Sequence, residues 1–218
     1  EMCIRDRFGF GTAAFTVECW IRPITVAAGT RSIFDFRTTA TELSPYLYLD
    51  GANLEYYNNG AIAIQGTATI VANQWTHVAI SRTGTTTKMF VNGVQDGSSY
   101  TDSSNYGTNK PIRIGDDTAG NNHFIGYIDE FRVSTTARYT EAFTAPTGIF
   151  QGDSNTVLLI HFDGVEGQQH TDDWSGGESF TKGEYFNNDA ILETSRKTGA
   201  PAGFVGRSHR YYNAADNI

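Results

Sequence analysis

The sequence predicts an all-β fold, a two-sheet antiparallel sandwich of the jelly-roll type. Glycine is frequent, with 23 in 218 residues, and aromatic residues reach 13% while charged residues stay at 18%. Short runs that alternate between apolar and polar residues recur along the chain, with Asn-Gly or Asp-Gly dipeptides between them. Such runs are typical of half-buried strands, and such dipeptides favour the positive φ angles of hairpin turns.

The first strand is expected at 15–22, a run of strict alternation. One face is apolar and consists of Phe15, Val17, Cys19 and Ile21. The other face is mixed and consists of Thr16, Glu18, Trp20 and Arg22. Pro23 ends this strand, because proline has no N–H group for the ladder.

Nine further strands follow in chain order, at 32–37, 46–50, 53–57, 61–70, 75–82, 86–91, 112–114, 126–133 and 156–162. Four dipeptides mark turns between or after them, namely Asp50-Gly51, Asn59-Gly60, Asn92-Gly93 and Asp96-Gly97. In the strand at 126–133, strict alternation predicts that Asp129 and Glu130 point to opposite faces.

We expect one main domain, because sandwiches of about 200 residues are common as single units. We expect residues 8–162 to form this domain. Residues 1–7 form a leader whose run Met2–Arg7 resembles a translated sequencing-adaptor scar. Residues 163–218 are polar and form either a loop-rich extension or the start of a truncated second module.

Charge and cysteine content exclude several classes. The net charge of −8 disfavours nucleic-acid binding, which needs clustered basic residues. No apolar run approaches the length of a membrane helix, so we expect no membrane insertion. Cys3 and Cys19 are too few for a disulfide framework or a zinc site.

Four segments together resemble the concanavalin A-like lectin/glucanase superfamily, which includes laminin G-like and pentraxin-like domains. They are FTVECWIRP at 15–23, WTHVAISRTGTTTKMFVNGV at 75–94, IRIG at 112–115 and GYIDEFRVSTTARYTEAFTAP at 126–146. The resemblance implies a concanavalin A-like sandwich. The superfamily hosts lectins, enzymes and inert spacers alike, so the fold does not fix the function.

Two further segments, at 137–146 and 208–216, resemble parts of marine bacteriophage virion proteins. This second resemblance implies a virion or extracellular setting. Its expected partners are a cell-surface glycan or other virion proteins, and a homo-oligomer is a further option.

The best candidate for a metal site is the loop that contains Asp116, Asp117, Asn121 and Asn122. Carboxylate and amide oxygens on a glycine-containing loop suit Ca²⁺, and many members of the resembled superfamily bind calcium. An ordinary turn needs the same residue types, so the calcium and turn interpretations both stay open.

The candidate ligand-binding residues are aromatic: Trp20, Tyr46, Tyr48, Tyr56 and Tyr57. Their rings could stack on sugars from an exposed sheet face, or simply pack in the core. Tyr56 and Tyr57 are adjacent on a strand, so one of the two must point outward.

We expect no catalysis. Glycoside hydrolases of this fold carry paired carboxylates on one strand, and no such pattern is present; Asp129 and Glu130 are adjacent. The five histidines are isolated, and His77 and His161 fit structural roles within strands. The sequence therefore predicts a non-catalytic carbohydrate-binding or adhesion module, in a phage tail fibre or decoration protein. A virion capping or cementing module is the alternative, and a glycoside hydrolase ranks last.

Overall fold

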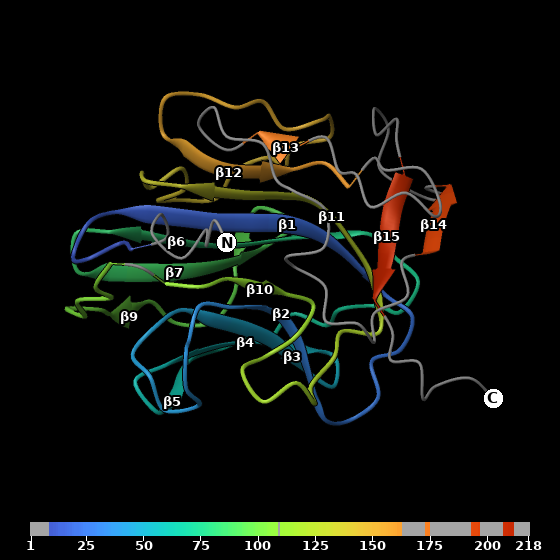
Figure 1. Ribbon diagram of the computed structural model, residues 1–218, viewed down its shortest axis with the longest axis horizontal. Coiled ribbons are helices and arrows are strands. Elements are labelled where there is room, and N and C mark those ends of the chain that lie inside the picture. The colour runs from blue at the N-terminus through green and yellow to red at the C-terminus, as the bar shows by residue number, and fades with distance from the viewer. Residues whose placement is uncertain (1–8, 109, 163–172, 175–192, 197–206, 212–218) are drawn as a thin grey trace, which may run out of the picture.

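The structure is a computed structural model that describes residues 9–108, 110–162, 173–174, 193–196 and 207–211. In these ranges it contains strands and turns but no helix, hence no helix that could cross a membrane. Two antiparallel sheets pack face to face, with sheet A in the upper half of Figure 1 and sheet B in the lower half. The predicted β-sandwich is confirmed.

Sheet A has ten strands in the order β13-β12-β11-β1-β6-β7-β8; in addition, β9 pairs with β7, β15 with β11, and β14 with β15. Their bounds are β1 (Phe15–Pro23), β6 (Thr76–Thr83), β7 (Thr86–Val91), β8 (Val94–Gln95), β9 (Tyr100–Thr101), β11 (Gly126–Ser134), β12 (Thr156–Ile160), β13 (Asp173–Trp174), β14 (Glu193–Arg196) and β15 (Arg207–Tyr211). The predicted extension at 163–218 lies mostly outside the described residues, and its three described strands join sheet A. The predicted leader, residues 1–7, lies outside them.

Sheet B has five strands in the order β10-β2-β3-β4-β5. They are β2 (Thr30–Asp35), β3 (Tyr46–Asp50), β4 (Asn53–Asn58), β5 (Ala61–Gln65) and β10 (Arg113–Ile114). Every strand predicted from the sequence is present. The predicted strand at 61–70 stops early, because Asp96 Oδ1 accepts the N–H groups of Thr67 and Ala68 at 2.7 and 2.9 Å.

Two of the predicted turns have positive φ at both residues. The angles are 53° and 79° at Asn59 and Gly60, and 50° and 81° at Asn92 and Gly93. Each dipeptide is a two-residue loop between paired strands, β4–β5 and β7–β8, as expected for a type I′ hairpin.

The core lies between the inner faces of the two sheets. The predicted apolar face of β1 is there, with Phe15, Val17, Cys19 and Ile21 fully buried. On sheet B, one row of opposed residues crosses four strands and faces them: Phe34, Leu47, Tyr56 and Ile64. Burying each such side chain contributes about 1.5–3 kcal/mol, so this core accounts for much of the stability.

The outer face of sheet A is also covered, by a segment we call the strap, residues 135–150. Tyr139 and Phe143 of the strap stack at 3.5 Å between ring centroids, and Phe143 N donates to Gly93 O at 2.9 Å. A Cβ at Gly93 would lie 1.9 Å from Phe143 O, so glycine permits this approach. The strap explains why both faces of β1 are buried.

The faces predicted for the strand at 126–133 are wrong, because β11 contains a bulge. Trp20 opposes Asp129 and Glu18 opposes Arg132, so the single residue Cys19 lies across from both Glu130 and Phe131. Glu130 has a φ of 51°, which breaks the alternation. As a result Ile128 shares the core with Phe131 and Val133, instead of facing away from them.

Candidate functional site

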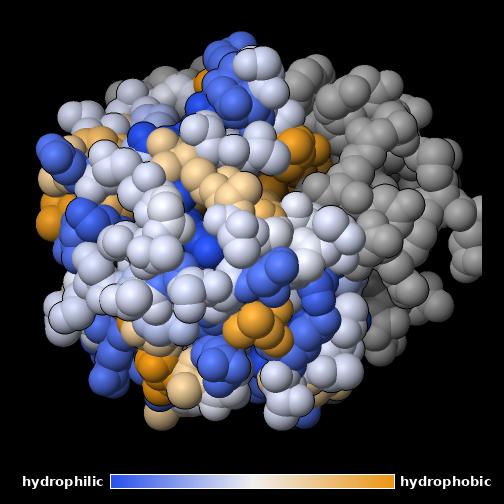
Figure 2. Space-filling model, turned by 90° about the vertical axis from the view of Figure 1, so that its left-hand side faces the viewer, coloured by the Kyte–Doolittle hydropathy of each residue, from blue (hydrophilic) through white to orange (hydrophobic). Residues whose placement is uncertain are grey.

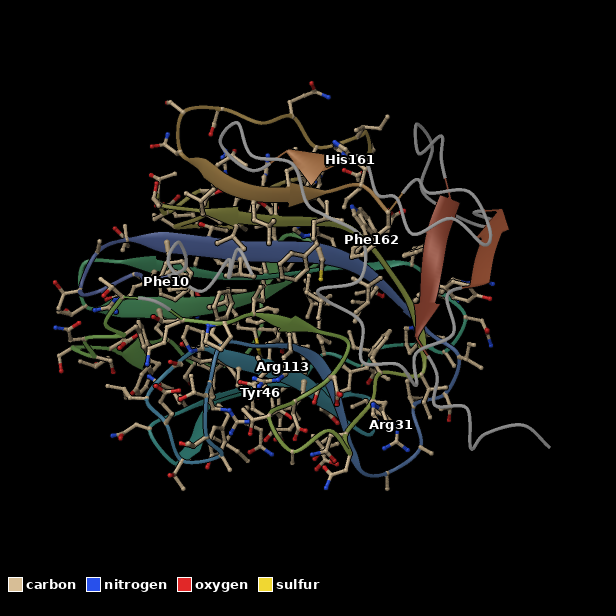
Figure 3. All side chains as sticks on the ribbon, viewed as in Figure 1. Phe10, Arg31, Tyr46, Arg113, His161 and Phe162 are labelled. Carbon is tan, nitrogen blue, oxygen red and sulfur yellow. The ribbon has the colours of Figure 1, made fainter. Side chains whose placement is uncertain are left out.

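Two rows of opposed residues form the outer face of sheet B. One row crosses all five strands through Arg113, Asp35, Tyr46, Tyr57 and Ile62. The other passes through Ser32, Tyr48, Glu55 and Gln65. Residues directly opposite in a sheet share a face, so these side chains lie together. We call the surface formed by Asp35, Arg37, Tyr46, Tyr48, Glu55 and Tyr57 the tyrosine face; Figure 3 labels Tyr46 and Arg113 on this sheet.

A fixed cation lies on this face. Arg37 Nε and Nη2 donate to the two carboxylate oxygens of Asp35, each at 2.9 Å. The Arg37 guanidinium carbon is 4.0 Å from the ring centre of Tyr46 and 5.2 Å from that of Tyr57. Burial lowers the pKa of Arg37, but its hydrogen bonds with Asp35 outweigh burial and raise that pKa overall. The guanidinium is therefore permanently charged and held in place.

The hydroxyl groups of Tyr46 and Tyr48 are uncharged, and each is held by a hydrogen bond to a neighbouring side chain. Tyr46 Oη and Ser32 Oγ are 2.8 Å apart, and Tyr48 Oη donates to Glu55 Oε2 at 2.7 Å. Burial raises the pKa of both tyrosines well above the usual value, so both hydroxyls stay protonated at neutral pH. Tyr46 and Tyr48 are only 4% and 7% exposed, whereas Tyr57 is partly exposed. Tyr57 is thus the ring of this face that a ligand can reach.

The loop 116–122 lies beside the tyrosine face. Thr118 N donates to Asp35 Oδ2 at 3.0 Å, and Asn122 O accepts from Ser32 N at 2.8 Å. The predicted metal residues and three of the predicted aromatic residues therefore belong to one region, although they are far apart in the sequence.

The carboxylate of Asp117 is largely used within the loop. Its Oδ1 accepts from Ala119 N and Gly120 N, each at 3.0 Å, and its Oδ2 accepts from Asn122 Nδ2 at 2.6 Å. Asp116 Oδ1 lies 3.3 Å from His123 Nδ1. Within the described ranges, no group of three or more His, Cys, Asp or Glu side chains could hold a metal ion. This geometry favours the turn interpretation, and calcium at Asp116, Asp117, Asn121 and Asn122 stays a prediction.

The structure separates two of the predicted aromatic residues from the other three. Trp20 is 4% exposed on the outer face of sheet A, where it packs with Phe150 and Leu159. Tyr56 is fully buried in the core, and its hydroxyl is 3.0 Å from that of Tyr106. Of the two interpretations that the sequence left open, Trp20 and Tyr56 therefore follow core packing; Tyr46 and Tyr48 are also buried, although they lie on the outer face of sheet B. Tyr57 is the outward member of its pair.

Sequence reasoning missed Asp35, Arg37 and Glu55. Asp35 and Arg37 are two positions apart at the end of a predicted strand, which places them on one face. That spacing, next to a tyrosine-rich strand, was the available signal. Glu55 could be placed only from the register between β3 and β4, which sets it opposite Tyr48.

The carboxylates on the outer face of sheet A form hydrogen bonds with the strap. Glu18 is fully buried, and its two oxygens interact with Arg132 Nε at 2.9 Å, His77 Nε2 at 3.1 Å and Tyr139 Oη at 2.7 Å. Burial raises the pKa of Glu18, but His77 and Arg132 outweigh burial and hold that pKa below its usual value. A charged Glu18 therefore joins β1, β6 and β11 to the strap.

The two adjacent carboxylates on β11 are also fully buried. Glu130 Oε2 accepts from Phe150 N at 2.8 Å and lies 3.0 Å from His161 Nδ1. Asp129 opposes Trp20, so the bulge brings both acids toward the outer side, contrary to the prediction of opposite faces. Like His77, His161 has the hydrogen-bonded partner expected of a structural imidazole.

The sequence matches a family model over residues 2–142, and that family is described as the concanavalin A-like lectin/glucanases superfamily. The chain belongs to this superfamily. The resemblance of the strand motifs to it is confirmed, and its sandwich fold is the one observed. No curated protein matches the sequence.

Solved structures similar to this superfamily member include a candidate carbohydrate-binding protein from Bacteroides ovatus, with a TM-score of 0.56 and 21% identity. That match covers 77% of this chain and 51% of the other, so the chain spans about half the length of that protein. Domain 4 of an extracellular arabinanase from Geobacillus stearothermophilus has a TM-score of 0.48, with 24% identity over 61% of this chain and 65% of the other. Mouse laminin α1 domains LG4-5 have a TM-score of 0.46, with 16% identity over 63% and 42%. At these identities the likeness concerns the fold.

Proposed function

We propose that this protein is a carbohydrate-binding module that holds a glycan against the tyrosine face. The observation that carries the proposal is the placement of Arg37, paired with Asp35 and stacked on Tyr46 close to the accessible ring of Tyr57. Ligand sites combine aromatic surface with a few fixed polar groups that orient the ligand. The partly exposed Tyr57 ring, held beside the fixed Arg37 guanidinium, suits stacking against a sugar ring.

The proposed module binds without cleaving. Hydrolysis of a glycosidic bond requires two carboxyl groups that flank it, roughly 5 to 9.5 Å apart. Asp129 and Glu130 are buried beneath the strap, Asp35 is paired with Arg37, and Glu55 accepts from Tyr48. Each of these acids is therefore committed to a structural partner.

We place the module on a virion or another extracellular surface. One consideration supports that setting, the similarity of 137–146 and 208–216 to phage virion segments. A tail fibre or a decoration protein would use such a module to recognise the host surface.

A capping or cementing role is the second candidate function. It is favoured by one feature, the uncharged edge strand β5, which suits assembly. Screening the intact chain on a glycan array, with and without a chelator, separates the two. Binding to a defined glycan, without release of reducing sugar, supports the carbohydrate-binding proposal; assembly with no glycan bound supports the second.

A further inference from the structure

The strap is attached unevenly along its length. Its first half ends at Phe143, whose N–H donates to Gly93 O at 2.9 Å. Among the described residues, the backbone of 144–149 makes a single hydrogen bond, to the side chain of Gln151 at 3.4 Å. Segments with few contacts open locally at low cost. The second half of the strap is therefore held mainly by the residue at its end, Phe150.

Phe150 fastens the end of the strap to the outer face of sheet A. It is 3% exposed and packs with Trp20 and Leu159, and the guanidinium carbon of Arg132 lies 4.5 Å from the centre of its ring. The Phe150 N–H donates to Glu130 Oε2 at 2.8 Å. Phe150 thus places a planar aromatic ring and an N–H donor side by side.

This contact satisfies only one oxygen of Glu130. Glu130 is fully buried, and its Oε1 has no hydrogen-bond partner among the described residues. Within the same residues, the one basic side chain in contact with this carboxylate is His161, whose Nδ1 lies 3.0 Å from Oε2; Figure 3 labels it directly after β12. A buried acceptor without a donor is costly, and the φ of 51° at Glu130 adds strain. An unpaired buried group on a strained backbone is a feature of ligand sites.

Two more polar atoms without a partner lie around Phe150. The ring of His77 is centred 6.0 Å from that of Phe150; its Nε2 binds Glu18, while its Nδ1 is buried and has no partner among the described residues. Trp75 packs against the cluster that contains Phe150, and in the described part of the chain its buried Nε1 is also without a partner. Groups that could bind a ligand therefore surround the aromatic slot that Phe150 fills.

We propose that this slot is a second ligand site, which binds an aromatic primary amine when the end of the strap moves aside. The ring of the ligand replaces the ring of Phe150, and its ammonium group replaces the Phe150 N–H. An ammonium group has three N–H donors, so it can bond both oxygens of Glu130, whereas a backbone N–H bonds only one. Its positive charge also pairs with a buried carboxylate.

The surroundings of the slot determine the ligand class. Arg132 Nε and Nη2 donate to Glu18 at 2.9 and 2.6 Å, so this guanidinium contacts the ring in the slot and leaves Glu130 to the ligand. An aliphatic amine would lose the contact with Arg132 and with the aromatic cluster. An aromatic alcohol would bring no positive charge to Glu130.

The exposed surface offers an aromatic ring less. Figure 2 views the end of the sandwich at which β5 and β9 lie in Figure 1, and its coloured part shows apolar groups separated by polar ones. The slot at Phe150, by contrast, combines two tryptophans, Trp20 and Trp75, with a buried carboxylate. It lies on the opposite sheet from the tyrosine face, so this proposal does not rest on glycan binding.

The test is a titration of the full chain with phenethylamine, followed by amide hydrogen exchange. Binding should saturate with a dissociation constant below about 10 mM. Protection of the Phe150 amide should fall, because its hydrogen bond to Glu130 is broken, while protection of the Phe143 amide should not change. Phenethyl alcohol and butylamine each lack one half of the ligand and should bind at least about tenfold more weakly.

Two variants test the contact with the ammonium group. Glu130→Gln keeps an acceptor for Phe150 N but removes the negative charge, and should weaken binding more than about tenfold. Glu141→Gln makes the same charge change at an exposed residue of the strap and should bind as the parent does.

The proposal fails if phenethylamine does not bind the parent, or binds without loss of protection at Phe150. It also fails if the three compounds bind equally, or if both variants keep the affinity of the parent. The comparison of compounds needs no variant, so it decides the matter even where Glu130→Gln does not fold. Because no sugar is present, these outcomes are independent of whether the tyrosine face binds glycan.

Discussion

The guanidinium carbon of Arg37 lies 4.0 Å from the ring centre of Tyr46, while Arg37 Nε and Nη2 bind the carboxylate of Asp35. Arg37 is 5% exposed and Asp35 is fully buried, so the pair is shielded from water. Because the strap covers the outer face of sheet A, the tyrosine face is the sheet surface that we assign to the glycan.

Replacing Arg37 tests how firmly this pair is held. Arg37→Met should lower the free energy of unfolding by about 3–5 kcal/mol, because it leaves the buried Asp35 carboxylate unpaired. The double variant Asp35→Leu/Arg37→Met removes both charges and should recover part of that loss. Urea unfolding measures both, and a loss of under about 1 kcal/mol in Arg37→Met would show that the pair is not shielded as described.

The packing of the strap requires Phe143 O to lie close to Gly93. The other Asn-Gly turn, at Gly60, has similar backbone angles without such a neighbour, so a substitution there is the control. Gly60 has a φ of 79° with nothing within 4 Å of an added Cβ, so Gly60→Ala should cost only about 1–2 kcal/mol of backbone strain. Gly93→Ala adds a collision with Phe143 O to similar strain and should cost about 1–3 kcal/mol more. Equal thermal destabilisation in the two variants would mean that the strap does not pack against this turn.

The buried carboxylate of Glu18 should make the stability of the fold depend on pH. Its folded pKa lies below the ordinary value of 4.5, so its charged form contributes stability above about that pH. This contribution is lost as the pH falls through the folded pKa. In chemical unfolding between pH 7 and pH 3, the parent should therefore lose more stability than Glu18→Gln, which starts lower at pH 7. Parallel pH profiles would contradict the coupling of Glu18 to His77, Arg132 and Tyr139.

Much of the fold could be predicted because its signals are local. Strand alternation and Asn-Gly turns act over a few residues, so β3 and β7 have the predicted ends. The bulge at Glu130 has no local signal, since it depends on how β1 and β11 register. Trp20 was assigned to the mixed face of its strand correctly, but its burial comes from Phe150, 130 positions away in the sequence.

The candidate site was predicted only in part, for the same reason. Adjacency alone showed that Tyr56 and Tyr57 diverge, and the register of sheet B decides which one points outward. The stacking of Arg37 on Tyr46 depends on a chain reversal between β2 and β3 that strand periodicity does not encode.

The hydrogen bonds within the loop 116–122 indicate how calcium should affect the melting temperature. Because Asp117 already accepts three hydrogen bonds, we expect the same melting temperature in calcium and in chelator. Asp117→Asn should lower stability by about 1–2 kcal/mol in both conditions, since it places two amide donors against each other. A calcium-dependent rise in melting temperature that Asp117→Asn abolishes would instead establish the metal site.

The most direct test of the central claim is a calorimetric titration of the intact chain with the glycan that gives the strongest array signal. Tyr57→Ala should weaken binding about tenfold or more, because it removes the accessible ring of the tyrosine face. Tyr127→Ala is the matched control, a partly exposed tyrosine on sheet A with its own arginine, Arg22, at 5.5 Å. The account predicts a loss in Tyr57→Ala alone; equal affinities for the parent and Tyr57→Ala, or no glycan bound at all, would contradict it.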